Sequence, residues 1–253
     1  MAKHGVFYHT IIAKRPTFCR AIIAKRPAFC VIIALRRPRQ REAVDMELVL
    51  VRHGETEYNR ADVFRGRKDL PLNRQGVKQA RAAASYLKDQ EFEAFYSSPL
   101  LRALQTASEI ASPHAGEVEP LEAFIDVDYG HWSGKSLDEV KPSWPQEFAL
   151  WSEDPAKVVF PGGESMREVR KRLRAGLEGL AGKHRHRVLL VGHKVVNRLI
   201  ICIVLGLPTS GIWRVDQSNG AINIISRDER GWMLKRLNDV SHLQGIASID
   251  QRT

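Results

Sequence analysis

The sequence contains few cysteines and no long apolar run. Its three cysteines, Cys19, Cys30 and Cys202, do not form a CxxC pair. This pattern argues against a disulfide framework and against a structural zinc site, and it fits a reducing compartment such as the cytoplasm. No apolar run reaches the ~18 residues that a membrane span needs, and no apolar segment precedes a small-residue cleavage site. We therefore expect neither a membrane span nor a secretory signal.

Acidic residues are scarce only at the beginning of the chain. Residues 1–45 hold ten basic and two acidic side chains, a net charge of +8, whereas residues 46–253 hold 29 basic and 27 acidic side chains, a net charge of +2. The body of the protein is thus close to neutral, although the whole chain carries +10. A near-neutral body lacks the electrostatic footprint of a nucleic-acid-binding protein, so we expect no nucleic-acid partner for it.

The first 45 residues contain a near-repeat. An eleven-residue unit begins at Ile11 and again at Ile22, and a decayed copy begins at Ile32. This period, interrupted by prolines, matches no known solenoid. Our preferred hypothesis is that Met46 is the true start and that the preceding segment is translated repeat DNA or a disordered extension. The alternatives are a membrane-surface or nucleic-acid-binding arm and an organelle-targeting segment, which would be basic like this one but richer in serine.

From residue 46 on, apolar runs of strand length alternate with helical patterns. The expected strands are residues 48–51, 92–96 and 187–191, followed by a hairpin of 221–226 and 232–237. The expected helices are residues 73–88, which Asn73 caps, residues 100–111, a helix that opens with a capping box of Ser165 and Glu168, and residues 195–205. This alternation predicts an α/β protein with three α/β/α layers around a mostly parallel sheet.

Residues 117–163 interrupt this alternation. The segment holds three tryptophans and several prolines, and its strand and helix patterns are weak. We expect it to fold as a helical or loop insertion that caps the carboxyl ends of the strands like a lid. The chain is thereby divided into an N-terminal extension, residues 1–45, and one domain, residues 46–253, that contains this lid.

Two of the expected strands end in a histidine. The first runs into Arg52-His53-Gly54 and the third into Gly192-His193, while Arg102 follows the second strand in the first turn of a helix. Ligands of open α/β sheets bind beyond the carboxyl ends of the strands, and helix N-termini attract anions. An arginine fork holds phosphate oxygens and a histidine can attack phosphorus, so these side chains suit phosphate chemistry. Gly54 lets the backbone turn sharply and come close to a ligand.

Five short segments carry a more specific signal when they are taken in order. They are Arg52–Thr56 with Asn59, Ser97–Ala107, Asp126–Gly134, Pro161–Ser165 and Gly192–His193. At these separations they closely resemble the histidine phosphatase superfamily, whose members share the phosphoglycerate-mutase-like fold. The resemblance covers essentially all of residues 46–253. Its segment 126–134 is more similar to the phosphatase branch than to the cofactor-dependent mutase branch.

The resemblance implies that His53 is the nucleophile and becomes a phosphohistidine. It also implies that Arg52, Arg102 and His193 bind the transferring phosphoryl group and that Asn59 supports it, with no metal and no cofactor. The physical chemistry agrees. Two guanidinium groups disfavour the imidazolium form of His53 and so keep a nitrogen lone pair available, and the same cations stabilise the charge on the equatorial oxygens. The sequence has no carboxylate cluster typical of a magnesium site.

The leaving alkoxide needs a proton, and the resemblance places the acid four residues before the first glycine of a G-x-W-x-G segment. Here that position is Asp126, where the family usually has glutamate, which is one methylene longer. Free aspartate has a pKa of ~3.9, so a phosphate dianion must favour the protonated form of this side chain before it can donate a proton. Asp128, which strand alternation would put on the same face, and Glu122 are the alternatives.

Further residues are expected near the pocket or away from it. Arg65 either contacts substrate at the pocket mouth or belongs to a solvated loop. Lys194 follows the second histidine where many relatives have glycine. Its amide can still serve the phosphate, and we expect its side chain to point away from the pocket rather than to add a charge there. We expect His184 and His186 at the surface and Cys202 in the core.

The sequence therefore predicts a phosphoric monoester hydrolase. We expect a metal-independent phosphomonoesterase that acts through phospho-His53 on a small phosphorylated metabolite, with water activated by Asp126 in the second step. A phosphoglycerate mutase is the alternative among enzymes, and a non-catalytic phospho-ligand-binding scaffold is the alternative of another class. Small sugar phosphates, phosphoglycerates and the α-ribazole phosphate of cobalamin assembly are candidate substrates, because the fold alone does not fix the function. The sequence also leaves a homodimer open.

Overall fold

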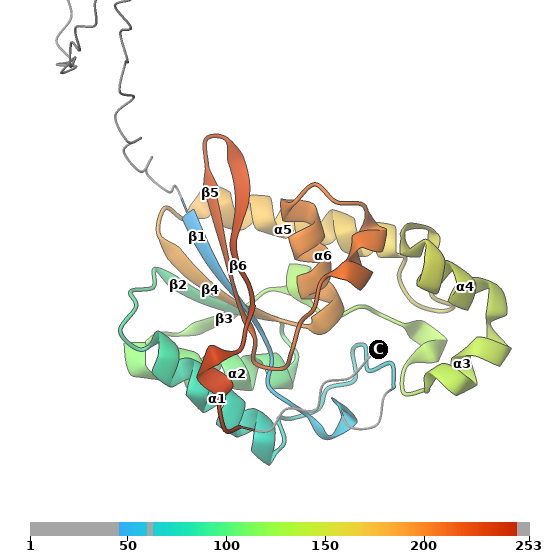
Figure 1. The fold of residues 1–253 in the computed structure, drawn as a ribbon, viewed down its shortest axis with the longest axis horizontal. Coiled ribbons are helices and arrows are strands. Elements are labelled where there is room, and N and C mark those ends of the chain that lie inside the picture. The colour runs from blue at the N-terminus through green and yellow to red at the C-terminus, as the bar shows by residue number, and fades with distance from the viewer. Residues whose placement is uncertain (1–45, 60–62, 247–253) are drawn as a thin grey trace, which may run out of the picture. The chain divides into compact units, whose positions relative to one another are not determined.

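The computed structural model describes residues 46–59 and 63–246. Its centre is a six-stranded sheet in the order β3-β2-β4-β1-β5-β6 (Figure 1). The strands are β1 Met46–Arg52, β2 Ala94–Ser97, β3 Val118–Pro120, β4 Arg187–Gly192, β5 Ile222–Asp228 and β6 Gly231–Asp239. β1, β4, β2 and β3 pair in parallel, whereas β5 is antiparallel to both β1 and β6. The expected α/β fold with a mostly parallel sheet and a C-terminal hairpin is confirmed. The hypotheses on residues 1–45 lie outside the described residues.

Helices flank this sheet. The α-helices of the described residues are α1 Arg74–Leu87, α2 Leu101–Ala111, α3 Leu137–Ser143, α4 Pro145–Glu153, α5 Met166–Lys183 and α6 Lys194–Val204. Short 3-10 helices connect them, among them η3 Glu122–Phe124, η4 Gly130–Trp132 and η6 Thr209–Arg214. Within residues 46–59 and 63–246, no helix is both long enough and apolar enough to cross a membrane.

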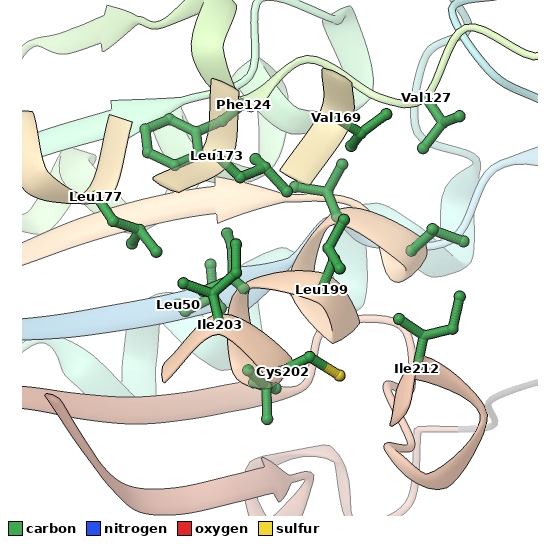
Figure 2. Packing of buried hydrophobic residues seen from close by; sticks show 14 of the residues in the cluster. Leu50, Phe124, Val127, Val169, Leu173, Leu177, Leu199, Cys202, Ile203 and Ile212 are labelled. Atoms are coloured by element: carbon green, nitrogen blue, oxygen red, sulfur yellow. The ribbon is translucent and has the colours of Figure 1, made fainter. Parts of the chain in front are cut away.

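The strand β1 is buried on both faces because its side chains alternate between two apolar cores. Leu48 and Leu50 belong to the core that α5 and α6 cover, whereas Val49 and Val51 belong to the core that α1 and α2 cover. Figure 2 shows the first core, in which Leu50 lies among side chains of both covering helices. The two cores on either side of β1 give the three layers that the sequence predicts. They also fix the direction of β1 and therefore the place where this strand ends.

Two helices begin where the sequence indicates. The side-chain oxygen of Asn73 accepts a hydrogen bond from the Gly76 amide at 2.8 Å and caps α1. Ser165 and Glu168 form the reciprocal capping box at the start of α5. A cap of this kind stabilises a helix by about 1 kcal/mol. Since α2 begins at Leu101, Arg102 lies in its first turn as expected.

The segment 117–163 is not all insertion. Residues Val118–Pro120 form β3, which pairs in parallel with β2 at the edge of the sheet. The pattern does not indicate this strand because it is only three residues long and none of its side chains is fully buried. The later part of the segment contains α3 and α4, which lie next to each other (Figure 1).

His184 is buried, which corrects the expectation of a surface position. It follows α5 and is 4% exposed. Its Nε2 lies 2.8 Å from the Tyr96 hydroxyl and its Nδ1 lies 2.8 Å from a carboxylate oxygen of Glu93. Because both ring nitrogens have partners, the imidazole can leave water without an unsatisfied polar group. His186 is exposed and Cys202 is buried, as expected.

Candidate active site

The carboxyl ends of two adjacent strands bring His53 and His193 together. β1 and β4 are parallel neighbours, and Arg52 is opposite Gly192 at their last paired position. The next residue of each strand is a histidine, and the centroids of the two imidazole rings are 5.2 Å apart. Both side chains are almost completely buried. Parallel pairing thus joins two residues that are far apart in the sequence.

His53 is held with one nitrogen towards the backbone. Its Nδ1 lies 2.6 Å from the carbonyl oxygen of Gly54. A carbonyl can only accept a hydrogen bond, so Nδ1 carries the proton and the lone pair is on Nε2. Burial, followed by the charge of Arg102, lowers the pKa of His53 well below its usual value. His53 is therefore neutral near pH 7 and has a free lone pair, which is what a nucleophile requires.

In His193, Nε2 is the ring nitrogen that the protein holds, and Nδ1 is the one that faces Asp126. Its Nε2 lies 2.7 Å from the Ser98 hydroxyl oxygen, which also accepts a hydrogen bond from the Leu100 amide. The Ser98 hydroxyl can donate its proton to Nε2, and the Asp126 carboxylate that faces Nδ1 favours the ring proton on that nitrogen. Nδ1 has no hydrogen-bond partner among the described residues and lies 3.6 Å from the nearer carboxylate oxygen of Asp126. Burial and Arg102 lower the pKa of His193 as well, so it presents a neutral N–H donor.

Arg102 reaches the same place from α2. Its side chain is 1% exposed and donates to the carbonyl oxygens of Gly66 and Lys68 at 2.9 and 2.8 Å. The Nη2 that binds Gly66 also donates to Asp126 at 2.9 Å. These fixed acceptors hold the guanidinium plane in one orientation, as bidentate recognition of a phosphoryl group requires. Asp126, the preferred acid, is 8% exposed and stands between Arg102 and His193.

The two alternative acids lie elsewhere. Residues 125–129 are not a strand, so the alternation that would put Asp128 beside Asp126 does not apply. Asp128 instead accepts from the Gly130 amide at 3.0 Å and faces Arg67 at 3.5 Å. Glu122 is exposed in η3. The geometry therefore favours Asp126 among the three carboxylates.

Arg52 is supported by a buried polar cluster behind β1. Its guanidinium donates to the main-chain carbonyl of Gln217. The side chain of Gln217 is in turn fixed by two hydrogen bonds with the Asn223 amide, at 2.8 and 2.9 Å. Asn223 also donates to the carbonyl of Leu50 at 3.0 Å. The cluster gives Arg52 a fixed anchor, and Asn223 ties it to the neighbouring strand.

Gly54 and Asn59 stand behind the pocket and do not line it. A Cβ atom on Gly54 would lie 2.5 Å from the carbonyl oxygen of Gly76, so the glycine lets the loop pack against the start of α1. Asn59 is fully buried, and its side-chain oxygen accepts from the amide and hydroxyl of Thr56 at 2.8 and 2.9 Å. Both residues shape the loop after β1, and the close approach at Gly54 is to protein backbone.

A cavity of about 270 Å³ opens beside these groups. Arg52, His53 and Asp126 form its polar end, and Arg65 and Lys194 also line it. Arg65 is half-buried and donates to the carbonyl of Tyr58 at 3.1 Å. Lys194 is buried, 7% exposed. Burial beside the cavity favours the second alternative for Lys194, in which it adds positive charge to the pocket.

The sequence analysis did not identify Arg172 and Glu164. The guanidinium of Arg172 donates to the carbonyl oxygens of Ala123, Ile125 and Asp126 at 2.9, 2.8 and 3.3 Å. It also forms a two-pronged ion pair with Glu164 at 2.8 and 3.2 Å. This arginine therefore ties the loop that carries Asp126 to α5. The only signal in the sequence is the glutamate of the Pro-Gly-Gly-Glu loop, because an arginine on a helix face resembles a solvated side chain.

The assembled groups match the needs of phosphoryl transfer. The His53 imidazole is neutral, the charges of Arg52 and Arg102 act on it, and its ring lies 5.2 Å from that of His193, while the Asp126 carboxylate pairs with Arg102. Such fixed cations stabilise the equatorial oxygens of the transition state. In the described part of the chain, no group of three or more histidine, cysteine or acidic side chains is arranged to hold a metal ion.

Known proteins share this architecture. Residues 48–240 match the family described as "Histidine phosphatase superfamily (branch 1)". The chain is 37% identical over 199 residues to "Phosphoserine phosphatase 1" of Hydrogenobacter thermophilus, covering 78% of this chain and 94% of that protein. It is 32% identical over 212 residues to "Metal-independent phosphoserine phosphatase" of Arabidopsis thaliana, covering 81% and 86%. The solved structure of Bacillus stearothermophilus YhfR superposes with a TM-score of 0.74 at 27% identity, covering 78% of this chain and 99% of that one. The chain therefore belongs to branch 1 of the histidine phosphatase superfamily.

Proposed function

We propose that the chain is a metal-independent phosphomonoesterase that forms a phosphohistidine on His53. The observation that carries the proposal is the state of this side chain. Its proton is fixed on Nδ1 by the Gly54 carbonyl, and burial beside Arg102 lowers its pKa, so that Nε2 keeps a lone pair near pH 7. A histidine with only a structural role would not need an unprotonated nitrogen beside guanidinium groups.

In the first step, Nε2 of His53 forms a bond to phosphorus while the ester P–O bond breaks. Asp126 gives its proton to the leaving alkoxide, and Arg52, Arg102 and His193 stabilise the phosphoryl oxygens. In the second step, ionised Asp126 takes a proton from water, whose oxygen attacks phosphorus as the N–P bond breaks. The positive charge comes from the chain's own side chains, and the name of the Arabidopsis relative supports metal independence.

The first test measures phosphate release from p-nitrophenyl phosphate by the full chain, with and without EDTA. We expect EDTA to have no effect and His53→Ala to lower kcat by more than about 100-fold. His186→Ala is the matched control, since it removes an exposed histidine outside the site. A rapid-quench experiment with labelled ester should trap an acid-labile, alkali-stable phosphoenzyme in the wild type.

Each other outcome has a definite meaning. Turnover that survives in His53→Ala would exclude the phosphohistidine route. Activity that EDTA removes and a divalent cation restores would exclude metal independence. Exchange of the phosphoryl group between phosphoglycerates, with little release of phosphate, would identify the mutase instead. Binding of phosphate esters without turnover would identify the non-catalytic scaffold.

The role of Asp126 can be separated from that of His53. The p-nitrophenolate leaving group is stable without a proton, whereas the dephosphorylation step still requires a general base. We therefore expect Asp126→Asn to release p-nitrophenolate in a fast burst of about one equivalent and then to turn over slowly. Absence of the burst would contradict the assignment of Asp126 to proton transfer, provided that the variant still binds inorganic phosphate.

A further inference from the structure

The cavity beside His53 has a polar end and an apolar body. Arg52, His53 and Asp126 form the polar end. The apolar residues that line the remainder are Val63, Phe64, Tyr129, Leu137, Phe148, Trp151, Val195 and Trp213. They come from the loop after β1, the segment before η4, the helices α3, α4 and α6, and η6. A volume of about 270 Å³ suits one small molecule and not a polymer.

The aromatic part of this wall is packed and fixed. The ring of Phe64 meets Tyr129 edge-on with centroids 5.1 Å apart, and Tyr129 meets Trp151 at 6.2 Å. Trp151 in turn meets Trp213 edge-on at 4.8 Å. Edge-to-face contacts of this kind favour one arrangement of the rings. The wall is thus an apolar surface that exists before a ligand binds, and Trp213, which is 39% exposed, lies at its outer limit.

The charged residues around the cavity are mostly positive. Among the described residues that line it, Arg52, Arg65 and Lys194 are cations and Asp126 is an anion. Asp126 already pairs with Arg102 at 2.9 Å. The positive charge at this end suits the phosphoryl dianion of a phosphomonoester.

We propose that the preferred substrate is the phosphomonoester of an alcohol that has a ring-sized apolar body. The phosphoryl group would lie at the polar end, and the apolar body would lie against Phe64, Phe148 and Trp213. This inference rests on the proposed function, since it concerns the same site. Phosphoserine, which the names of two relatives give as their substrate, lacks such an apolar body and therefore serves as a comparison ester.

The test compares kcat/KM for three esters of primary alcohols, so that the leaving groups have similar basicity. They are 2-phenylethyl phosphate, ethyl phosphate and O-phosphoserine. We expect the value for 2-phenylethyl phosphate to exceed both others by at least about tenfold, because apolar groups that fill an apolar pocket contribute this much selectivity. The full chain is used, and His53→Ala provides the background rate for each ester.

Variants locate the source of the selectivity. Trp213→Ala and Phe148→Ala should each lower the ratio of kcat/KM between 2-phenylethyl and ethyl phosphate by about tenfold. Leu150→Ala is the matched control, because Leu150 is on α4 with Phe148, is 37% exposed and does not line the cavity. It should keep the wild-type ratio.

The outcomes distinguish this inference from the proposed function. Equal values for the three esters, or the highest value for O-phosphoserine, would overturn the apolar substrate class while leaving the phosphohistidine mechanism in place. A wild-type ratio in both aromatic variants would also overturn it. Failure of the wild type to hydrolyse any of the esters or to form a phosphoenzyme would instead contradict the proposed function.

Discussion

Replacement of Arg172 by alanine tests whether the loop that carries Asp126 must be tied to α5. The variant loses donors to three main-chain carbonyls and both prongs of the Glu164 ion pair. The side chains of Arg172 and Glu164 are only 20% and 14% exposed, so solvent screens their interaction weakly. One hydrogen bond to a charged group contributes about 1.5–3 kcal/mol, and the five contacts are not additive, so we expect a stability loss of about 3 kcal/mol.

The catalytic effect of the same change depends on the leaving group. If the loop relaxes by about 1 Å, the proton from Asp126 is misplaced and the rate falls by about 100-fold. This loss should appear in kcat/KM for ethyl phosphate, whose alkoxide needs the proton. It should be much smaller for p-nitrophenyl phosphate, because kcat/KM covers only the steps up to release of the alcohol and p-nitrophenolate leaves unaided.

Two further variants complete this experiment. Arg172→Lys keeps the charge but not the planar fork, so it should recover only part of the loss. Arg167→Ala removes an exposed arginine from the same helix and should resemble the wild type. Equal losses on the two esters would show that Arg172 supports the fold in general and does not position Asp126. An unchanged kcat/KM for ethyl phosphate, measured well below the variant's Tm, would refute the reasoning outright.

Three other predictions follow from buried groups. Since His53 and His193 have depressed pKa values in the fold, the unfolded chain binds more protons below its own histidine pKa of ~6.5. Their contribution to stability is therefore present above pH 6.5 and falls by up to about 2–3 kcal/mol between pH 7.5 and 5.5, as urea unfolding at each pH should show. Gly54→Ala, which forces a Cβ against a main-chain carbonyl of α1, should cost about 1–3 kcal/mol, whereas Gly179→Ala, which has open space around it in α5, should be neutral or stabilising. His184→Phe should lower stability by about 1–3 kcal/mol, because it removes the hydrogen bonds with Tyr96 and Glu93, and it should leave kcat unchanged.

Each of these predictions can fail in a recognisable way. A double variant of His53 and His193, both changed to glutamine, should lose most of the excess pH dependence, and an unaltered slope would contradict the assignment to these two groups. A Gly54→Ala protein as stable as the wild type would mean that the loop can move away from α1. A fall in kcat for His184→Phe at unchanged stability would mean that this distant histidine influences the site.

The sequence predicts the parts of the site that depend on strand ends. His53 and His193 each follow a buried apolar strand, and parallel pairing of those strands is enough to bring them together. Arg102 is predictable for a similar reason, because it lies in the first turn of a helix that follows a strand. In these three cases a short local pattern determines where a strand ends or a helix begins. The side chain at that terminus then has little freedom of position.

Other features depend on partners that no local pattern identifies. His184 stands in a run of charged residues that is typical of a surface, but Tyr96 and Glu93, about 90 positions earlier in the chain, satisfy both of its nitrogens. The strand β3 is not predicted because its three residues, one half-buried and two exposed, gain their strand structure only from pairing with β2. In both cases the deciding interaction is tertiary, and the local sequence preference is too weak to reveal it.

The difference in predictability between the polar end and the apolar body of the cavity has the same physical origin. The polar end comes mainly from strand and helix termini, where the backbone fixes the direction of a side chain, so the sequence predicts it residue by residue. The apolar body comes from segments that touch only after folding, such as Phe64 before α1 and Trp213 after α6. Aromatic residues in such segments are ordinary core residues by any sequence criterion. The proposed chemistry can therefore be predicted from the motifs. The proposed selectivity for the alcohol depends instead on how Phe64, Trp151 and Trp213 pack beside the cavity.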